Sequence, residues 1–207
     1  MISLGMEKLC TMEFEAGNIY HVYNQGNNRQ RVFFSDRNYE YFIRKVKMYV
    51  CPYADILAWC LMPNHFHMMV FVKFTHRVTS SHPVSKLRTI NDSIAIMLRS
   101  YTRGVNNELN RSGSLFREDT KAVCLTMQDG VTPSWYTHNG ITHIFNDDPE
   151  KEYTQVCFNY IHQNPVSHGF VFDPNDWHYS SFSEYSNTSG KAVVNKARAE
   201  EYDLFIN

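Results

Sequence analysis

Hydrophobic positions recur with two different periods along the chain, every second residue in some segments and every three to four residues in others. This pattern predicts a mixture of strands and helices. Residues 17–23 alternate and are rich in aromatic and β-branched side chains, as in a half-buried strand. Bulky apolar residues dominate 53–61 and 65–74, and the turn formers Pro63 and Asn64 lie between them. We therefore predict two further strands that pair antiparallel as a hairpin.

Apolar residues at helical spacing predict three helices. One begins at Ser35, a favourable N-cap residue, and ends before Pro52. A long helix is predicted over 83–109, with arginines on its polar side. A third is predicted over 148–163, because Pro165 should limit its C-terminal end.

The remaining segments complete the predicted fold. Residues 75–82 are predicted to form a loop and 114–125 an extended segment, while 126–148 have no clear period and read as a long loop or insertion. The order β-α-β-β-α-β-α indicates the α+β class. We predict a ferredoxin-like arrangement, with a central antiparallel sheet and long helices packed on it.

Composition bounds the domain organisation and the compartment. The 207 residues suit one domain, which we place at 16–185, after a leader at 1–15 and before an acidic tail at 186–207. The five cysteines are scattered without a C-x-x-C pair, as expected in a reducing cytoplasm. No signal peptide is recognisable, and no apolar run approaches the length of a membrane span, so we expect no membrane partner.

The formal net charge of −1 hides a strong asymmetry. Residues 16–121 carry 15 Lys and Arg against 7 Asp and Glu, whereas 122–207 carry 4 against 11. A basic body suits a polyanionic ligand such as a nucleic acid, although ordinary solvated surfaces give the same pattern.

The first candidate for chemistry is a histidine pair. His65 and His67 are two residues apart in a predicted strand, so both side chains project from the same face. Two imidazoles held in this way form half of a site for a divalent metal. A third ligand from elsewhere and open positions for a substrate complete such a site.

The third predicted helix offers both a nucleophile and a third ligand. Tyr160 and Asn164 are four residues apart and share a helix face if the helix persists to Asn164. An amide oxygen suits Mg²⁺ or Mn²⁺, and a neighbouring tyrosine can attack a group that the metal polarises. Asn164 also fits a helix C-cap, in which case Gln163 or His162 is the ligand.

Candidate nucleic-acid contacts lie in a polar turn and on a helix. The turn at 24–31 is dense in amide and guanidinium donors, which hold phosphates and read base edges. An ordinary Asn/Gly turn has the same composition. The candidates are Asn27, Asn28, Arg29 and Arg31 in the turn and Arg99 and Arg103 on the long helix.

Five motifs occur in a characteristic order. They are YHVYNQGNNRQ at 20–30, WCLMPNHFH at 59–67, GSLF at 113–116, YIHQNPV at 160–166 and WHYSS at 177–181. The ordered set resembles the single-tyrosine HUH transposases, specifically their REP-associated tyrosine transposase branch. Relatives usually have a shorter stretch where this chain has its insertion.

The resemblance implies a ferredoxin-like fold and cleavage and rejoining of single-stranded DNA near hairpins. It implies that Tyr160 is the nucleophile and forms a 5′-phosphotyrosine. His65 and His67 would be the metal-binding pair for Mg²⁺ or Mn²⁺, with Asn164 as a further ligand. Some relatives are dimers and others act as monomers, so the resemblance allows a homodimer.

Two other functions stay open on the sequence. One is a domesticated module that binds hairpin DNA without cutting it, although the intact histidines and Tyr160 favour cleavage. The other is a zinc hydrolase that uses Cys60 together with His65 and His67.

Overall fold

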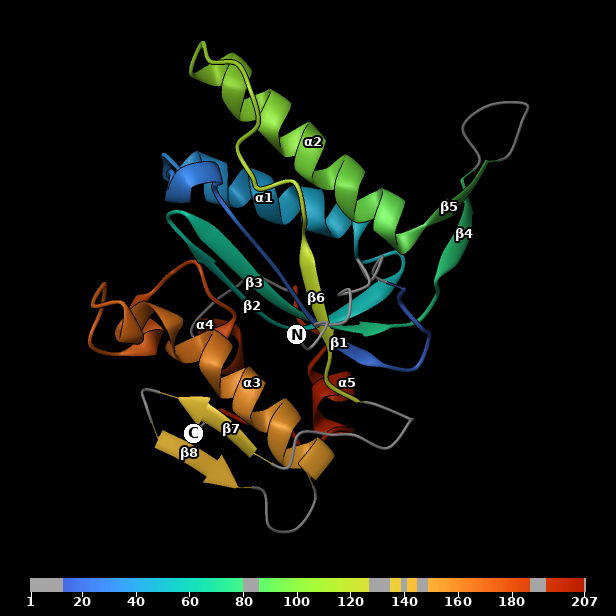
Figure 1. Cartoon of the computed structure of the whole chain (residues 1–207), viewed down its shortest axis with the longest axis vertical. Helices are drawn as coiled ribbons and strands as arrows, with labels where there is room; N and C mark the ends of the chain where they lie inside the picture. The colour runs from blue at the N-terminus through green and yellow to red at the C-terminus, as the bar shows by residue number, and fades with distance from the viewer. Residues whose placement is uncertain are drawn as a thin grey trace, which may run out of the picture.

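Four antiparallel strands in the order β2-β3-β1-β6 form the central sheet of the computed structural model (Figure 1). Its strands are β1 (Ile19–Gln25), β2 (Ala54–Met62), β3 (His65–Val72) and β6 (Lys121–Cys124). The structure describes residues 13–79, 86–126, 135–138, 141–144, 149–186 and 193–206. The predicted leader up to residue 12 and the tail at 187–192 and 207 lie outside them.

Helices cover both faces of this sheet. α1 (Asp36–Tyr49) and α2 (Ile90–Glu108) pack on one face, and α3 (Pro149–Ser167) packs on the other (Figure 1). Alternate residues of β3 face the two sides, so that Phe66 lies in the α1/α2 core and Met69 in the α3 core. The architecture confirms the predicted α+β fold with a central antiparallel sheet.

The start of the second helix differs from the prediction. β5 (Lys86–Thr89) occupies its expected first turns and pairs with β4 (His76–Thr79), where a loop was expected. Helix α2 begins after Thr89, whose hydroxyl accepts from the Asp92 backbone N–H at 3.0 Å while the Asp92 carboxylate accepts from the Thr89 N–H. This capping box fixes the start, so the prediction from residue 83 is wrong.

The end of α3 differs as well. The helix continues through Pro165 to Ser167, instead of ending near residue 163. Proline removes one helical N–H and its ring crowds the carbonyl four residues back, but the residues after it still bond to the last carbonyls, including His168 N–H to Asn164 O at 3.1 Å. Gly169, at φ +71°, provides the left-handed C-terminal turn. Asn164 therefore stays on the helix, on the face that carries Tyr160.

Part of the predicted insertion at 126–148 is regular. β7 (Trp135–His138) and β8 (Ile141–Ile144) form an antiparallel hairpin within it. The short elements are η1 (Asn27–Arg29), η2 (Pro174–Asp176), α4 (Phe182–Tyr185) and α5 (Lys196–Glu200). In the part of the chain that the structure describes, no helix combines the length and the apolarity needed to cross a bilayer.

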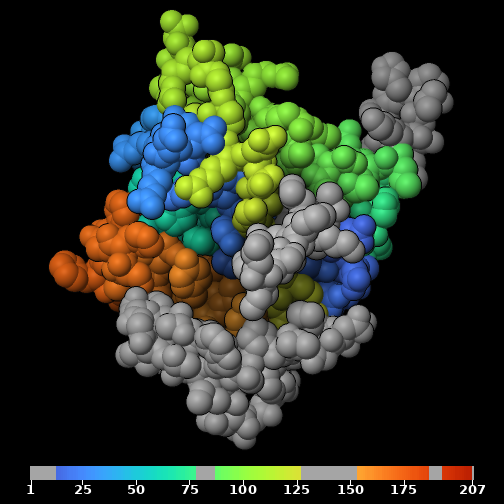
Figure 2. Space-filling model, viewed as in Figure 1, coloured from blue at the N-terminus to red at the C-terminus, as the bar shows by residue number. Residues whose placement is uncertain are grey.

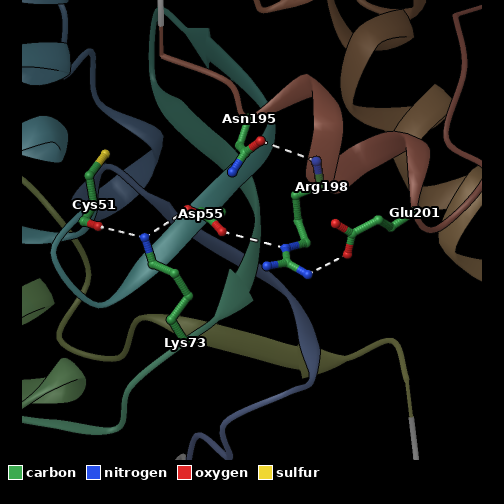
Figure 3. Close-up of polar contacts among 6 residues, drawn as sticks. All are labelled: Cys51, Asp55, Lys73, Asn195, Arg198 and Glu201. Atoms are coloured by element: carbon green, nitrogen blue, oxygen red, sulfur yellow. Dashed lines mark hydrogen bonds and ion pairs between the residues drawn. The ribbon is translucent and has the colours of Figure 1, made fainter.

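Residues 193–206 of the acidic tail are built into the fold. Ala199 and Leu204 are buried in the α3 core. Asp55 of β2 pairs with Lys73 at 2.7 Å and with Arg198 of α5 at 3.6 Å, and Arg198 also contacts Glu201 (Figure 3).

A buried glutamate fixes the start of the same segment. Glu184 accepts from the Trp59 indole at 2.9 Å and, through its second oxygen, from the backbone N–H groups of Val193 and Val194. The bond between Trp59 and Glu184 is buried, so it satisfies two polar groups that would otherwise lack a partner in the core.

Truncation of Leu204 tests whether the tail is part of the core. We expect Leu204→Ala to lower the free energy of unfolding by about 2–5 kcal/mol, because it leaves a cavity beside buried neighbours. Phe205→Ala is the matched control, since that side chain is 54% exposed and its change should have little effect. Urea denaturation measures both. Equal stability of the two variants would contradict the assignment.

Candidate active site

The histidine pair and the tyrosine meet between β3 and α3. His65 and His67 project from the β3 face that α3 covers, with ring centroids 5.0 Å apart. The Tyr160 ring lies 5.3 Å from that of His67. Tyr160 is 41% exposed, so the residue is accessible to a large substrate.

Asn164 comes from the same helix and faces His65. Its Oδ1 lies 3.1 Å from His65 Nε2, and its side chain is buried. His162 points elsewhere: it is buried and its Nε2 lies 2.7 Å from Ser181 Oγ. Gln163 is exposed. Of the three possible helix ligands, Asn164 is therefore the one that the structure brings to the histidine pair.

A hydrogen-bond chain fixes the tautomer of His65. The Asn64 amide nitrogen donates to the carbonyl of Arg29 at 3.4 Å, so its Oδ1 faces His65 Nδ1 at 2.6 Å. His65 Nδ1 must therefore carry the proton and donate. The opposite nitrogen, Nε2, is left with a lone pair directed at Asn164.

The meeting of His65 and Asn164 fits a metal site. His65 Nε2 and Asn164 Oδ1 are both acceptors, so they cannot bond to each other across 3.1 Å. An octahedral Mg²⁺ site with ligands at 2.0–2.1 Å places neighbouring ligand atoms about 3 Å apart. The Asn164 amide nitrogen is buried without a hydrogen-bond partner among the described residues. The Asn164 side chain also neighbours the Tyr160 phenol and lowers its pKa, against the effect of burial.

The described residues offer no zinc site based on Cys60. No group of three His, Cys, Asp or Glu side chains among them is placed to hold a metal. Cys60 is the cross-strand partner of His67, but its Sγ lies 3.8 Å from Met62 Sδ. Burial raises the pKa of its thiol, which keeps it protonated and a poor ligand.

His21 of β1 joins this cluster, and the sequence analysis missed it. Its Nε2 lies 2.9 Å from His67 Nδ1. Burial lowers the pKa of His21 to about 4 and that of His67 well below its ordinary value. Both rings are neutral near pH 7, so one donates and the other accepts. His21 lies within a quoted motif, but only the register of β1 against β3 brings it to His67.

His168 is a second residue that the sequence analysis missed. Its Nδ1 donates to the Asn164 carbonyl at 2.9 Å, and its ring lies 5.6 Å from that of His65. Tyr160, Asn164 and His168 are spaced by four residues, so they follow one side of α3 and its C-terminal end.

The predicted nucleic-acid contacts fall into two places. Asn28 and Arg29 form a turn beside Asn64 with positive φ angles of 51° and 58°, a conformation that is rare for such residues. Asn27 donates to the Ser114 carbonyl, and Arg31 is exposed. Arg99 and Arg103 instead line a groove beside α2, on the face opposite α3.

The sheet order and the helices on its two faces define a ferredoxin-like fold. Among solved structures, the chain is similar to a REP-associated tyrosine transposase bound to a REP hairpin. The TM-score is 0.50 at 14% sequence identity, and the match covers 92% of this chain and 98% of that one. No protein-family model and no curated protein sequence matches. The likeness therefore shows a shared fold.

The buried histidines predict acid sensitivity of the fold. A histidine titrates near pH 6.5 when unfolded, and folded His21 titrates at about 4. The unfolded chain thus binds more protons in this window, and the stabilisation present above pH 6.5 is lost as the pH falls toward 4. We expect the free energy of unfolding to decrease by up to ~1.4 kcal/mol per pH unit for each such histidine.

Urea denaturation between pH 7 and pH 4 measures this loss, with His21→Gln as the comparison. The free energy of unfolding of the variant should depend less steeply on pH. The variant lacks the titrating His21, and it also removes the charge repulsion by which His21 lowers the pKa of His67. The same slope in both proteins would contradict the assignment.

Proposed function

We propose that this protein is a metal-dependent endonuclease and strand transferase for single-stranded DNA, acting near hairpins in DNA transposition through a 5′-phosphotyrosine. The observation that carries this proposal is the convergence of two elements: α3 brings Tyr160 against His67 and Asn164 against His65. The fold that the chain shares with a hairpin-bound tyrosine transposase supports the same substrate class.

His65, His67 and Asn164 would hold a Mg²⁺ or Mn²⁺ ion. When bound, such an ion polarises and orients a phosphate oxygen. Donation from His67 Nδ1 to His21 would leave the His67 Nε2 lone pair directed at the ion, as Asn64 does for His65. The two nitrogens and the amide oxygen leave further positions for phosphate and water.

Tyr160 carries out the covalent step. Its hydroxyl oxygen attacks the scissile phosphorus and forms the new P–O bond, and the bond to the 3′-oxygen breaks. The tyrosine proton is lost, and the leaving oxygen takes up a proton as a 3′-hydroxyl. Attack by a 3′-hydroxyl reverses these changes and rejoins DNA without ATP, since the ester is retained throughout.

The surroundings of Tyr160 require deprotonation during attack. Burial raises the pKa of its phenol, and the neighbouring Asn164 side chain acts in the opposite direction. The hydroxyl therefore carries its proton at neutral pH. Because Tyr160 meets His67 of the same chain, we propose that it acts in cis, whether or not the protein forms a homodimer.

Tyr160→Phe tests the nucleophile. Wild type incubated with labelled single-stranded DNA hairpins and Mg²⁺ or Mn²⁺ should form a covalent adduct that denaturing gels resolve, and EDTA should abolish it. The variant should bind the hairpins and form no adduct, because the attacking oxygen is missing.

Tyr23→Phe is the matched control, since the Tyr23 ring also lies near His67, at 5.8 Å. An adduct that survives in Tyr160→Phe and disappears in Tyr23→Phe would show that Tyr23, and not Tyr160, is the nucleophile. Tight binding without an adduct on any hairpin would favour a binding module that does not cut.

Asn64→Ala tests the metal centre separately from catalysis. We expect Mn²⁺ affinity to fall about 10–100-fold, because His65 loses the partner that fixes its tautomer and orientation. Electron paramagnetic resonance of free Mn²⁺ measures the affinity without DNA. Asn107→Ala, an exposed change on α2, is the control. Unchanged affinity in Asn64→Ala would show that Asn64 does not position His65.

A further inference from the structure

Arginines from two segments converge on one groove on the α1/α2 side of the sheet. The groove lies between α2 and the chain that leads from α2 to β6, and its volume is about 550 Å³. Figure 2 shows these two segments, green and yellow-green, side by side on the surface. The residues used below are Arg99, Arg103, Asn106, Arg111, Phe116 and Arg117.

The groove carries an excess of positive charge, because its lining has four arginines and one carboxylate, that of Glu118. Arg99, Arg103 and Arg117 form no ion pair with a carboxylate in the described ranges. Arg111 donates to the neutral side chain of Gln30 at 2.9 Å. Arg99 and Arg103 are four residues apart on one helix, where like charges repel. A bound anion would remove this repulsion.

The groove also offers an unpaired acceptor. The Asn106 amide nitrogen donates to the Gly113 carbonyl at 2.7 Å, which fixes the orientation of the amide. Its Oδ1 is buried and has no hydrogen-bond partner among the described residues. A phosphate oxygen cannot satisfy it, because both groups are acceptors. An N–H donor, such as a base amino group, can.

We propose that this groove binds the phosphodiester backbone of the hairpin DNA, with Asn106 accepting from a base. The proposal rests on the function proposed above. The planar guanidinium forks of the arginines match phosphate oxygens, and the Asn106 acceptor distinguishes a nucleic acid from a simple inorganic anion.

The groove is close enough to the active site to serve the same DNA molecule. The Arg117 backbone N–H donates to the Gln25 carbonyl at 2.9 Å, and Gln25 pairs with His65 across β1 and β3. The backbone of Arg117 is thus two strand spacings from that of His65, which amounts to roughly 10 Å. This length corresponds to about three base steps along one DNA strand. The groove and the histidine pair therefore lie at the same end of the sheet, on its two faces, and one DNA molecule that passes around this end would contact both.

The double change Arg99→Gln and Arg103→Gln tests the groove. Fluorescence anisotropy with a labelled hairpin in EDTA measures binding without cleavage, over a range of salt concentrations. We expect Kd to rise at least ~10-fold and the slope of log K against log salt to become shallower by about two, since two phosphate contacts are lost. Arg117→Gln should reduce the slope by about one.

Two controls define the cause. Arg37→Gln with Arg44→Gln removes the same charge from exposed sites on α1, outside the groove, and should leave Kd nearly unchanged. Arg99→Lys with Arg103→Lys should restore most of the salt slope. Thermal unfolding checks that every variant is folded.

The outcomes separate this proposal from the proposed cleavage. Groove variants that bind hairpins like wild type, while wild type forms adducts, overturn the groove alone. Loss of binding in these variants, with no adduct from wild type on any hairpin, supports the groove and overturns cleavage. Inorganic phosphate is the last probe. If it raises the thermal unfolding temperature of wild type but not of Arg99→Gln with Arg103→Gln, and hairpin DNA does not bind, the groove is a small-anion site and the proposal is overturned.

Discussion

Backbone pairing on both edges of β3 determines where the histidine pair lies. β3 is hydrogen-bonded to β1 on one side and to β2 on the other, so its register is fixed twice. Phe66 and Met68 fill the α1/α2 core, and His67 and Met69 face α3. A slip of one residue would exchange these sets, burying imidazoles among aromatic rings. The position of the histidine pair is thus a property of the sheet.

The buried polar side chains under α3 are stabilised by hydrogen bonds to one another. Buried imidazoles and amides cost free energy unless each finds a partner. Asn64 serves His65, His21 serves His67, and the Asn164 carbonyl accepts from His168. Two buried nitrogens on α3, the Asn164 amide nitrogen and His162 Nδ1, have no hydrogen-bond partner among the described residues. The first of them belongs to the residue that faces His65 Nε2.

Local patterns allowed much of this fold to be predicted, and non-local contacts account for the rest. The β2–β3 hairpin and α1 follow from turn residues, periodicity and caps. The start of α2 depends on the capping box of Thr89 and Asp92, and α3 continues for two residues beyond Pro165, so neither helix end coincides with its nearest proline. His21 could not be assigned to the site, because its partner depends on strand register.

The groove shows the same division between local and non-local information. Arg99 and Arg103 follow from the polar side of a predicted helix. Arg111 and Arg117 join them only because the chain turns back after α2. Helical spacing in the sequence carries no information about that return path.

The packing of residues 193–206 has a consequence for how the chain acquires its structure. The Trp59–Glu184 bond joins residues 125 apart, and Glu184 in turn holds Val193 and Val194. During synthesis, β2 emerges long before the segment that covers it, so the α3 core closes late. Such distant contacts slow folding and leave the apolar face of β2 exposed in the meantime. We therefore expect the yield of folded protein to depend on conditions that limit aggregation during synthesis.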